Sequence, residues 1–192
     1  MKKFKSYLSS ASLLALVVFQ PYFAHAEIAG NVGKIRVYGA LVESPCQLQM
    51  ETADQSVNLG NIQTADLEFI GDKAHSTPFI VQLQDCIQTN TKIKNYKMDT
   101  DTWSTYQPGF KIRFLAESAQ NFPNLVAVNG AKGIGLQLSE NDGSPIDLGT
   151  DSKPLLVEPP QDAFRYWITP IKISQLEPNA FHSIISFELI YE

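Results

Sequence analysis

Two cysteines, Cys46 and Cys86, are the residues of this chain with the clearest chemistry. Neither has a histidine or a second cysteine nearby at the spacing of a metal site. Both lie beyond an N-terminal segment with export features, and an even pair of cysteines in an oxidising compartment favours a disulfide. That bond would close a loop of about 41 residues and stabilise the fold by roughly 4 kcal/mol. Two free thiols or half of a metal site are the alternatives.

No pattern in the chain predicts catalysis. Beyond residue 26 the only histidines are His75 and His182, and there is no Gly-x-Ser-x-Gly motif and no carboxylate pair typical of hydrolases. The glycines of 133–135 lack the third glycine and the following helix of a nucleotide loop. Asp99 and Asp101 lack the further oxygen donors of a calcium loop, which favours a solvated turn. We expect no enzyme, no cofactor and no metal.

Residues 1–26 have the features of a secretory signal peptide. Three lysines precede a short apolar run over 13–19, and a small-x-small cleavage site closes the segment at Ala26. The alternative, an amphipathic first helix of a cytosolic domain, leaves the lysines and the cleavage site unexplained. Cleavage would leave 166 residues, enough for one domain. The mature charge would be 12 − 20 = −8, which argues against nucleic acid as a partner.

Short strands separated by turn signals follow Cys46, which predicts an all-β sandwich. A single helical turn is expected near 65–69, and Asn141-Asp142-Gly143 predicts a tight turn. Pro170 implies an edge position or a bulge. The expected strands are 56–59, 78–83, one strand plus an elaborated loop within 89–108, 110–115, 122–128, 133–138, 146–148, 165–173 and 181–192.

The two ends of the mature chain have an unusual pattern. Near the N-terminus, residues 33–41 alternate, with Gly33, Ile35 and Val37 on one face. At the C-terminus the residues that share an inward face are Phe181, Ile185, Phe187, Leu189 and Tyr191. Because the chain stops at Glu192, nothing that follows in the sequence covers the free edge of this last strand.

In order, spacing and ending, these motifs resemble those of the chaperone–usher pilins, the subunits of bacterial fimbriae. The matching stretches cover essentially all of residues 27–192. They are Gly33-Lys-Ile-Arg-Val-Tyr-Gly39 followed by Cys46, Ser56-Val-Asn-Leu-Gly60, Pro78-Phe-Ile-Val-Gln-Leu-Gln-Asp-Cys86, Gly133-Ile-Gly-Leu-Gln-Leu138 with the Asp142-Gly143 turn, and Phe187-Glu-Leu-Ile-Tyr-Glu192.

The resemblance implies an incomplete immunoglobulin-like β-sandwich that is completed by a donor strand from another chain, as in β-strand addition by pilins. Its domains would be a cleaved signal peptide (1–26), a donor extension (27–38) and a pilin domain (39–192). The implied donor residues are Asn31, Gly33, Ile35 and Val37. The implied acceptor edge and chaperone-binding strand comprises Phe181, Ile185, Phe187, Leu189, Tyr191 and Glu192, with the terminal carboxylate held by basic residues of the chaperone.

The resemblance also implies partners and a location. These are neighbouring fimbrial subunits, a periplasmic chaperone and an outer-membrane usher, on a route through the periplasm to the cell surface. A bulk shaft subunit, a minor adaptor and a terminator are all compatible with the sequence, because 92–109 is longer than in a plain major pilin and Pro178-Asn179 replaces a common glycine. A sugar-binding adhesin remains a further alternative, with the aromatic candidates Trp103, Tyr106, Tyr166 and Trp167.

Overall fold

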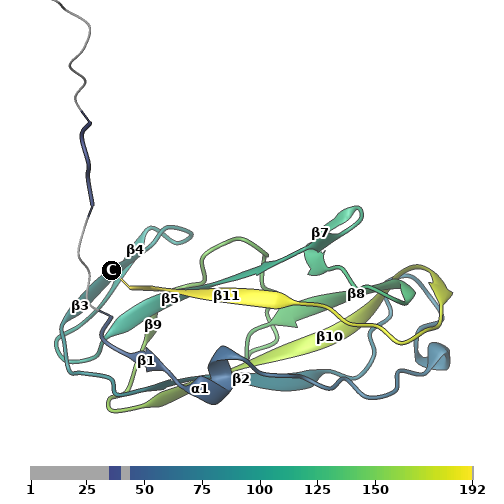
Figure 1. Ribbon diagram of the computed structural model, residues 1–192, viewed down its shortest axis with the longest axis horizontal. Coiled ribbons are helices and arrows are strands. Elements are labelled where there is room, and N and C mark those ends of the chain that lie inside the picture. The colour runs from purple at the N-terminus through teal and green to yellow at the C-terminus, as the bar shows by residue number, and fades with distance from the viewer. Residues whose placement is uncertain (1–34, 40–43, 192) are drawn as a thin grey trace, which may run out of the picture. The chain divides into compact units, whose positions relative to one another are not determined.

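The computed structural model describes residues 35–39 and 44–191 (Figure 1). The expected signal peptide, Asn31, Gly33 and Glu192 lie outside the described residues. Residues 35–39 belong to a unit separate from the one that begins at Val42. They form neither helix nor strand, and the side chains of Ile35 and Val37 are almost fully exposed.

The larger unit contains an antiparallel six-stranded sheet in the order β1-β2-β10-β8-β7-β6. Alternation of apolar and polar residues builds its strands: in β2, Phe79, Val81 and Leu83 are buried while Pro78 and Ile80 are exposed. The strands are β1 (Gln47–Leu48), β2 (Thr77–Gln84), β6 (Ser118–Ala119), β7 (Phe122–Val126), β8 (Lys132–Ser139) and β10 (Asp162–Glu177).

A second antiparallel sheet has the order β11-β5-β9, with β11 (Ile185–Tyr191), β5 (Gly109–Ala116) and β9 (Leu155–Leu156). A separate hairpin joins β3 (Thr91–Asn95) to β4 (Thr100–Ser104). The short helices are α1 (Met50–Ala53) and the 3-10 turn η1 (Thr64–Asp66). The expected helical turn near 65–69 is therefore present, one residue earlier.

The core lies between these two sheets, which confirms an all-β sandwich. Phe79 of β2 and Tyr166 of β10 stack with ring centroids 5.5 Å apart, and Phe114 of β5 meets both rings edge-on, at 5.9 and 5.1 Å. Such edge-to-face pairs add about 0.5–1.5 kcal/mol each beyond the area that they bury. The aromatic contacts therefore fix the small sheet onto the large one.

Several expected strands differ from the structure. Residues 56–59 and 146–148 form no strand, and 89–108 holds a two-stranded hairpin rather than one strand with a loop. The last strand begins at Ile185, so Phe181 precedes it. The turn at 141–143 is confirmed, with Gly143 at φ +84° and its N–H donating to the Glu140 carbonyl.

Pro170 lies in a central strand, so the expected edge position is wrong. It is opposite Leu136 of β8, and on the other side of β10 the strand β2 begins only at Thr77, which pairs with Ile168. There the Pro170 carbonyl accepts a hydrogen bond from the Ala74 N–H. The proline is tolerated because the backbone N–H that it lacks is at a position beyond the regular hydrogen-bond ladder between β10 and β2.

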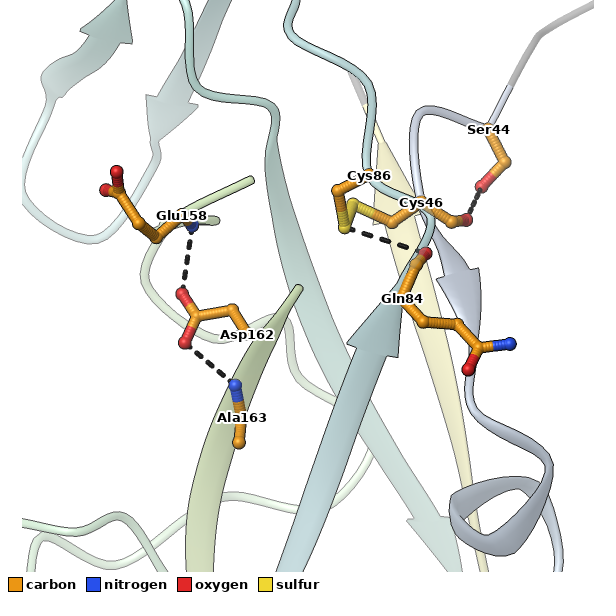
Figure 2. Close-up of a disulfide and its surroundings, with 7 residues drawn as sticks. All are labelled: Ser44, Cys46, Gln84, Cys86, Glu158, Asp162 and Ala163. Carbon is orange, nitrogen blue, oxygen red and sulfur yellow. Dashed lines mark hydrogen bonds between the residues drawn. A yellow bond between two sulfur atoms is a disulfide. The ribbon is translucent and has the colours of Figure 1, made fainter. Parts of the chain in front are cut away.

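Cys46 and Cys86 form the expected disulfide, and both residues are buried (Figure 2). Cys46 directly precedes β1 and Cys86 lies just after β2, so the bond ties together two adjacent strands, as predicted. Next to it, the Ile87 N–H donates to the Pro45 carbonyl at 2.9 Å. This region anchors the start of the domain to the sheet.

Replacing both cysteines, as in Cys46→Ser with Cys86→Ser, is expected to lower the free energy of unfolding by about 2 to 5 kcal/mol, because the unfolded chain regains loop entropy. Urea denaturation of the periplasmic protein measures the loss. The exposed substitution Ser118→Ala serves as the control and should change stability by less than about 0.5 kcal/mol. Equal midpoints for the cysteine variant and the wild type would contradict the expectation.

Candidate functional site: an open strand edge beside an apolar groove

The last strand, β11, is paired on one side only. It runs antiparallel to β5 over its full length, from the pair Ile185–Ala116 to the pair Tyr191–Phe110. No other described strand pairs with it. Its inward residues Phe187 and Leu189 are only half-buried, although they pack on the core. An edge of this kind leaves backbone donors and acceptors unpaired and apolar surface uncovered.

The opposite edge of the small sheet is closed. The Ile112 N–H donates to Ser152 Oγ at 3.0 Å, and the Ile112 carbonyl accepts from the Ser152 N–H at 2.9 Å. The Phe114 carbonyl accepts from the Gly149 N–H at 2.8 Å. Within this sheet, described residues therefore hydrogen-bond to the side of β5 that faces away from β11. The outer side of β11 is paired with no described strand.

A groove of about 1100 Å³ runs beside the open edge. Its floor is core that the two sheets leave uncovered, and its walls are the start of β11 with the preceding 177–184 segment and the residues that follow α1. The apolar residues that line it are Val57, Leu59, Ile62, Leu67, Phe79, Phe114, Ile134, Leu136, Ile168, Phe181, Ile185 and Phe187.

The wall opposite β11 is the segment 56–62. Its residues make no backbone–backbone hydrogen bond with any described residue, and Asn58 accepts the Gly60 N–H through its side chain. Val57 and Leu59 nevertheless turn inward and pack on the core. An extended segment laid in the groove would find unpaired backbone on both sides, at β11 and at 56–62.

The structure brings together part of the predicted acceptor residues. Phe181, Ile185 and Phe187 line the groove, whereas Leu189 packs on the core and Tyr191 lies against Phe110 with ring centroids 6.0 Å apart. The groove therefore lies along the first half of β11.

The sequence did not identify the floor and the second wall. The alternation of Val57 and Leu59 predicted a strand, but a strand needs a neighbour, and the neighbour of 56–59 is missing here. Phe79, Phe114 and Ile134 appeared in the sequence only as core positions. These three side chains are buried, and that they also line a groove depends on sheet packing that no local pattern encodes.

The other candidate residues are dispersed. His182 forms a backbone bridge with Asn129, and His75 lies in the loop before β2. Tyr166 is buried in the core, Trp167 is half-buried, and Trp103 is exposed on the β3–β4 hairpin. No cluster of metal-binding side chains occurs among the described residues. No described helix is long and apolar enough to span a membrane.

Comparison with known proteins gives the class of the chain. Residues 35–188 match the family described as Fimbrial protein. Long polar fimbria protein A of Salmonella typhimurium strain LT2 is 24% identical over 194 residues, which cover 98% of this chain and 97% of the relative. Fimbria A protein of Serratia marcescens is 27% identical over 164 residues, covering 83% of this chain and 84% of the relative.

Solved structures agree at the level of the fold. The crystal structure of the P pilus rod subunit PapA has a TM-score of 0.62 and 15% identity, and the match covers 78% of this chain and 100% of that chain. A chaperone–usher pilus structure also has a TM-score of 0.62, at 18% identity, and covers 86% of this chain and 98% of that chain. The fold is the incomplete immunoglobulin-like sandwich of these pilins.

The chain belongs to the fimbrial protein family. It is a structural subunit of a bacterial fimbria, and fimbriae are fibres of the cell surface. The relatives are structural subunits rather than enzymes, in line with the lack of a catalytic pattern.

The Tyr191 hydroxyl, near the end of β11, offers a test of how well that end is packed. Burial raises the pKa of Tyr191, opposed by the nearby Ser44 side chain, and the hydroxyl is buried without a geometrically well-formed hydrogen bond to any described residue. Tyr191→Phe is therefore expected to keep or raise stability, by up to about 1 kcal/mol, because it removes an unpaired buried donor.

Urea denaturation at pH 7 measures this change, and Tyr191→Ala, which deletes the ring packed on Phe110, is the contrasting variant. A raised pKa in the folded state means that the unfolded chain loses its proton first as pH rises. The stability of the wild type should therefore fall above about pH 10 relative to that of Tyr191→Phe. A Tyr191→Phe protein that is less stable at pH 7 would contradict the packing described here.

Proposed function

We propose that this subunit polymerises by donor-strand exchange, in which the N-terminal extension of a neighbouring subunit fills the groove beside β11. The observation that carries the proposal is the unpaired edge of β11 next to an apolar groove of about 1100 Å³. Strand addition suits such a site because it satisfies backbone groups and buries apolar side chains together. The proposed segments are a signal peptide (1–26), a donor extension (27–38) and a pilin domain (39–192).

The donor side of the exchange rests on the alternating segment that includes Ile35 and Val37. Both are apolar residues on the same face of a period-two pattern, as expected of a strand that buries one face in an apolar groove. Burial of a large apolar side chain contributes about 1.5–3 kcal/mol, so these two contribute several kcal/mol in addition to the backbone hydrogen bonds. Antiparallel pairing with β11 is expected, because antiparallel ladders are slightly more stable than parallel ones.

A periplasmic chaperone and an outer-membrane usher complete the proposed pathway. An uncovered apolar groove is an aggregation hazard, so the subunit needs a temporary strand donor before it reaches its neighbour. The chaperone would pair with β11 and hold the terminal carboxylate of Glu192 through basic residues. The usher would then release the subunit into the growing fibre at the cell surface.

The open groove favours a subunit that both accepts and donates. A terminator needs a groove that accepts no strand, and the lining described here is open along the first half of β11. A repeating shaft subunit is the first proposal, and a minor adaptor is the second, since both accept and donate. Catalysis and intrinsic sugar binding are not part of the proposed function.

Completion of the fold in cis tests the acceptor groove. A second copy of residues 31–37, joined after Glu192 by a short flexible linker, should produce a soluble monomer with a higher melting temperature than the unmodified subunit. The gain comes from covering the groove and the edge of β11. Calorimetry and gel filtration of the periplasmic proteins measure it.

The matched control carries aspartate in place of the appended Ile35 and Val37, because a charge cannot be buried in an apolar groove without a large cost. That control should melt like the unmodified subunit. If the intact appended strand gives no gain in melting temperature, the groove is not an acceptor site for this sequence.

A substitution at Gly33 distinguishes donation of the extension to a neighbouring subunit from a role of the extension in the folding of its own domain. Gly33→Leu should leave chaperone-bound yield nearly unchanged, because the extension lies outside its own domain. It should also block incorporation into fibres, since overpacking in the neighbour's groove costs about 1–3 kcal/mol or more. Pull-down with the chaperone and isolation of surface fibres measure the two steps separately.

Lys34→Leu is the control, because the period-two pattern predicts that position 34 faces away from the groove in the donated strand and tolerates the same side chain. Reduced chaperone-bound yield for Gly33→Leu, with normal incorporation of the protein that survives, would return this stretch to the core of its own domain.

A further inference from the structure

The β3–β4 hairpin carries exposed apolar side chains that the groove does not use. Tyr96, Met98 and Trp103 are 73%, 70% and 68% exposed, and Tyr106 at its base is half-exposed. Residues 91–106 also hold three lysines and two aspartates. Single exposed apolar residues are ordinary, but several on one short hairpin mark a contact surface. We name Tyr96, Met98, Trp103 and Tyr106 the hairpin patch.

The hairpin patch lies at the end of the domain from which the extension departs. The chain enters the hairpin through Ile87, whose N–H bonds to the Pro45 carbonyl, and the Thr89 N–H bonds to the Tyr106 carbonyl. The hairpin also packs on the start of β5, where the Tyr96 ring lies 4.7 Å from Lys111 Nζ. Figure 1 shows β3 and β4 near the C-terminal end of β11.

Further exposed apolar residues lie toward the other end of the domain, where Leu67 packs with Phe181 ahead of β11. Phe69 and Ile70 are 71% and 68% exposed, and Ile184, which directly precedes β11, is 80% exposed. The loop that carries Phe69 is held to the sheet, because Lys172 Nζ donates to the carbonyls of Leu67 and Glu68 at 2.9 and 2.6 Å. We name Phe69, Ile70 and Ile184 the loop patch.

Donor-strand geometry brings these two patches together. A donor antiparallel to β11 leaves the groove beside Ile185, next to the loop patch. Val37 and Pro45 are eight positions apart along the chain, a reach of at most about 29 Å. The body of the donor, with its hairpin patch beside Pro45, is therefore held close to the loop patch of the acceptor, at high effective concentration.

We propose that the hairpin patch of one copy docks on the loop patch of the copy that accepts its extension, and that this contact sets the angle between consecutive subunits. The proposal rests on the proposed function. A head-to-tail contact between two different patches propagates without closing, which is the symmetry of a filament.

Photo-crosslinking tests the contact in assembled fibres. p-Benzoylphenylalanine in place of Trp103, in the full chain co-expressed with its chaperone and usher, should crosslink to residues 64–72 or 178–186 of another copy. A crosslink within one copy is excluded, because β11 alone separates the two ends by about 20 Å. The control places the same group at Ile80, a partly exposed residue on the outer face of β2, which should not label these peptides.

A paired variant, Trp103→Ala with Ile70→Ala, gives the second measurement. Its detergent-resistant ladder of multimers should persist, while electron microscopy should show loss of the regular subunit repeat. Loss of the ladder in Gly33→Leu but not in this variant separates donor exchange from docking.

Three results would overturn the proposal. The first is crosslinks from position 103 to other surfaces only, and the second is an unchanged repeat in the paired variant. The third is a Trp103→Ala fibre that keeps the regular repeat but no longer binds a glycan array that wild-type fibres bind. That result would make the hairpin a sugar-binding site instead of a docking surface. A wild-type chain that forms no ladder would remove the proposed function and this inference together.

Discussion

The uncovered edge of β11 is the constraint on which the rest of the structure depends. The strand β11 pairs with β5 and its inward side chains are half-buried, and no other described strand pairs with its free edge. The core beneath it is left open as a groove. Stability and assembly are therefore linked. The backbone and apolar groups that have no partner in the isolated domain are the groups that another chain can pair with and cover.

The rest of the domain limits this incompleteness to one place. Ser152 and Gly149 occupy the far edge of β5, and the disulfide at Cys46–Cys86 ties β1 to β2 next to the point where the extension departs. Aromatic packing of Phe79, Phe114 and Tyr166 joins the two sheets. A rigid sandwich with a single unsatisfied edge in its small sheet directs association along one axis instead of allowing general aggregation.

The family match identifies the kind of protein, and the geometry of the structure locates its contact surfaces. The match over residues 35–188 establishes a fimbrial subunit, while the relatives share only about a quarter of their residues with this chain. At that distance the individual side chains at the contact surfaces have to be taken from this structure. The hairpin at 91–104 is such a feature: it exposes apolar side chains, and the chain enters it through Ile87, whose N–H donates to the Pro45 carbonyl.

The sequence by itself determined the all-β class, the cysteine pair and the inward face of the last strand, because alternation and turn residues are local signals. It also predicts that Ile35 and Val37 share one face of the extension, and this stays a prediction. It failed at 56–59, where alternation predicted a strand, at Pro170, where a central strand tolerates a proline, and at 89–108, where it expected one strand and the chain forms a hairpin. Those outcomes were decided by tertiary structure, since whether a segment pairs depends on which neighbours the packing of two sheets brings to it.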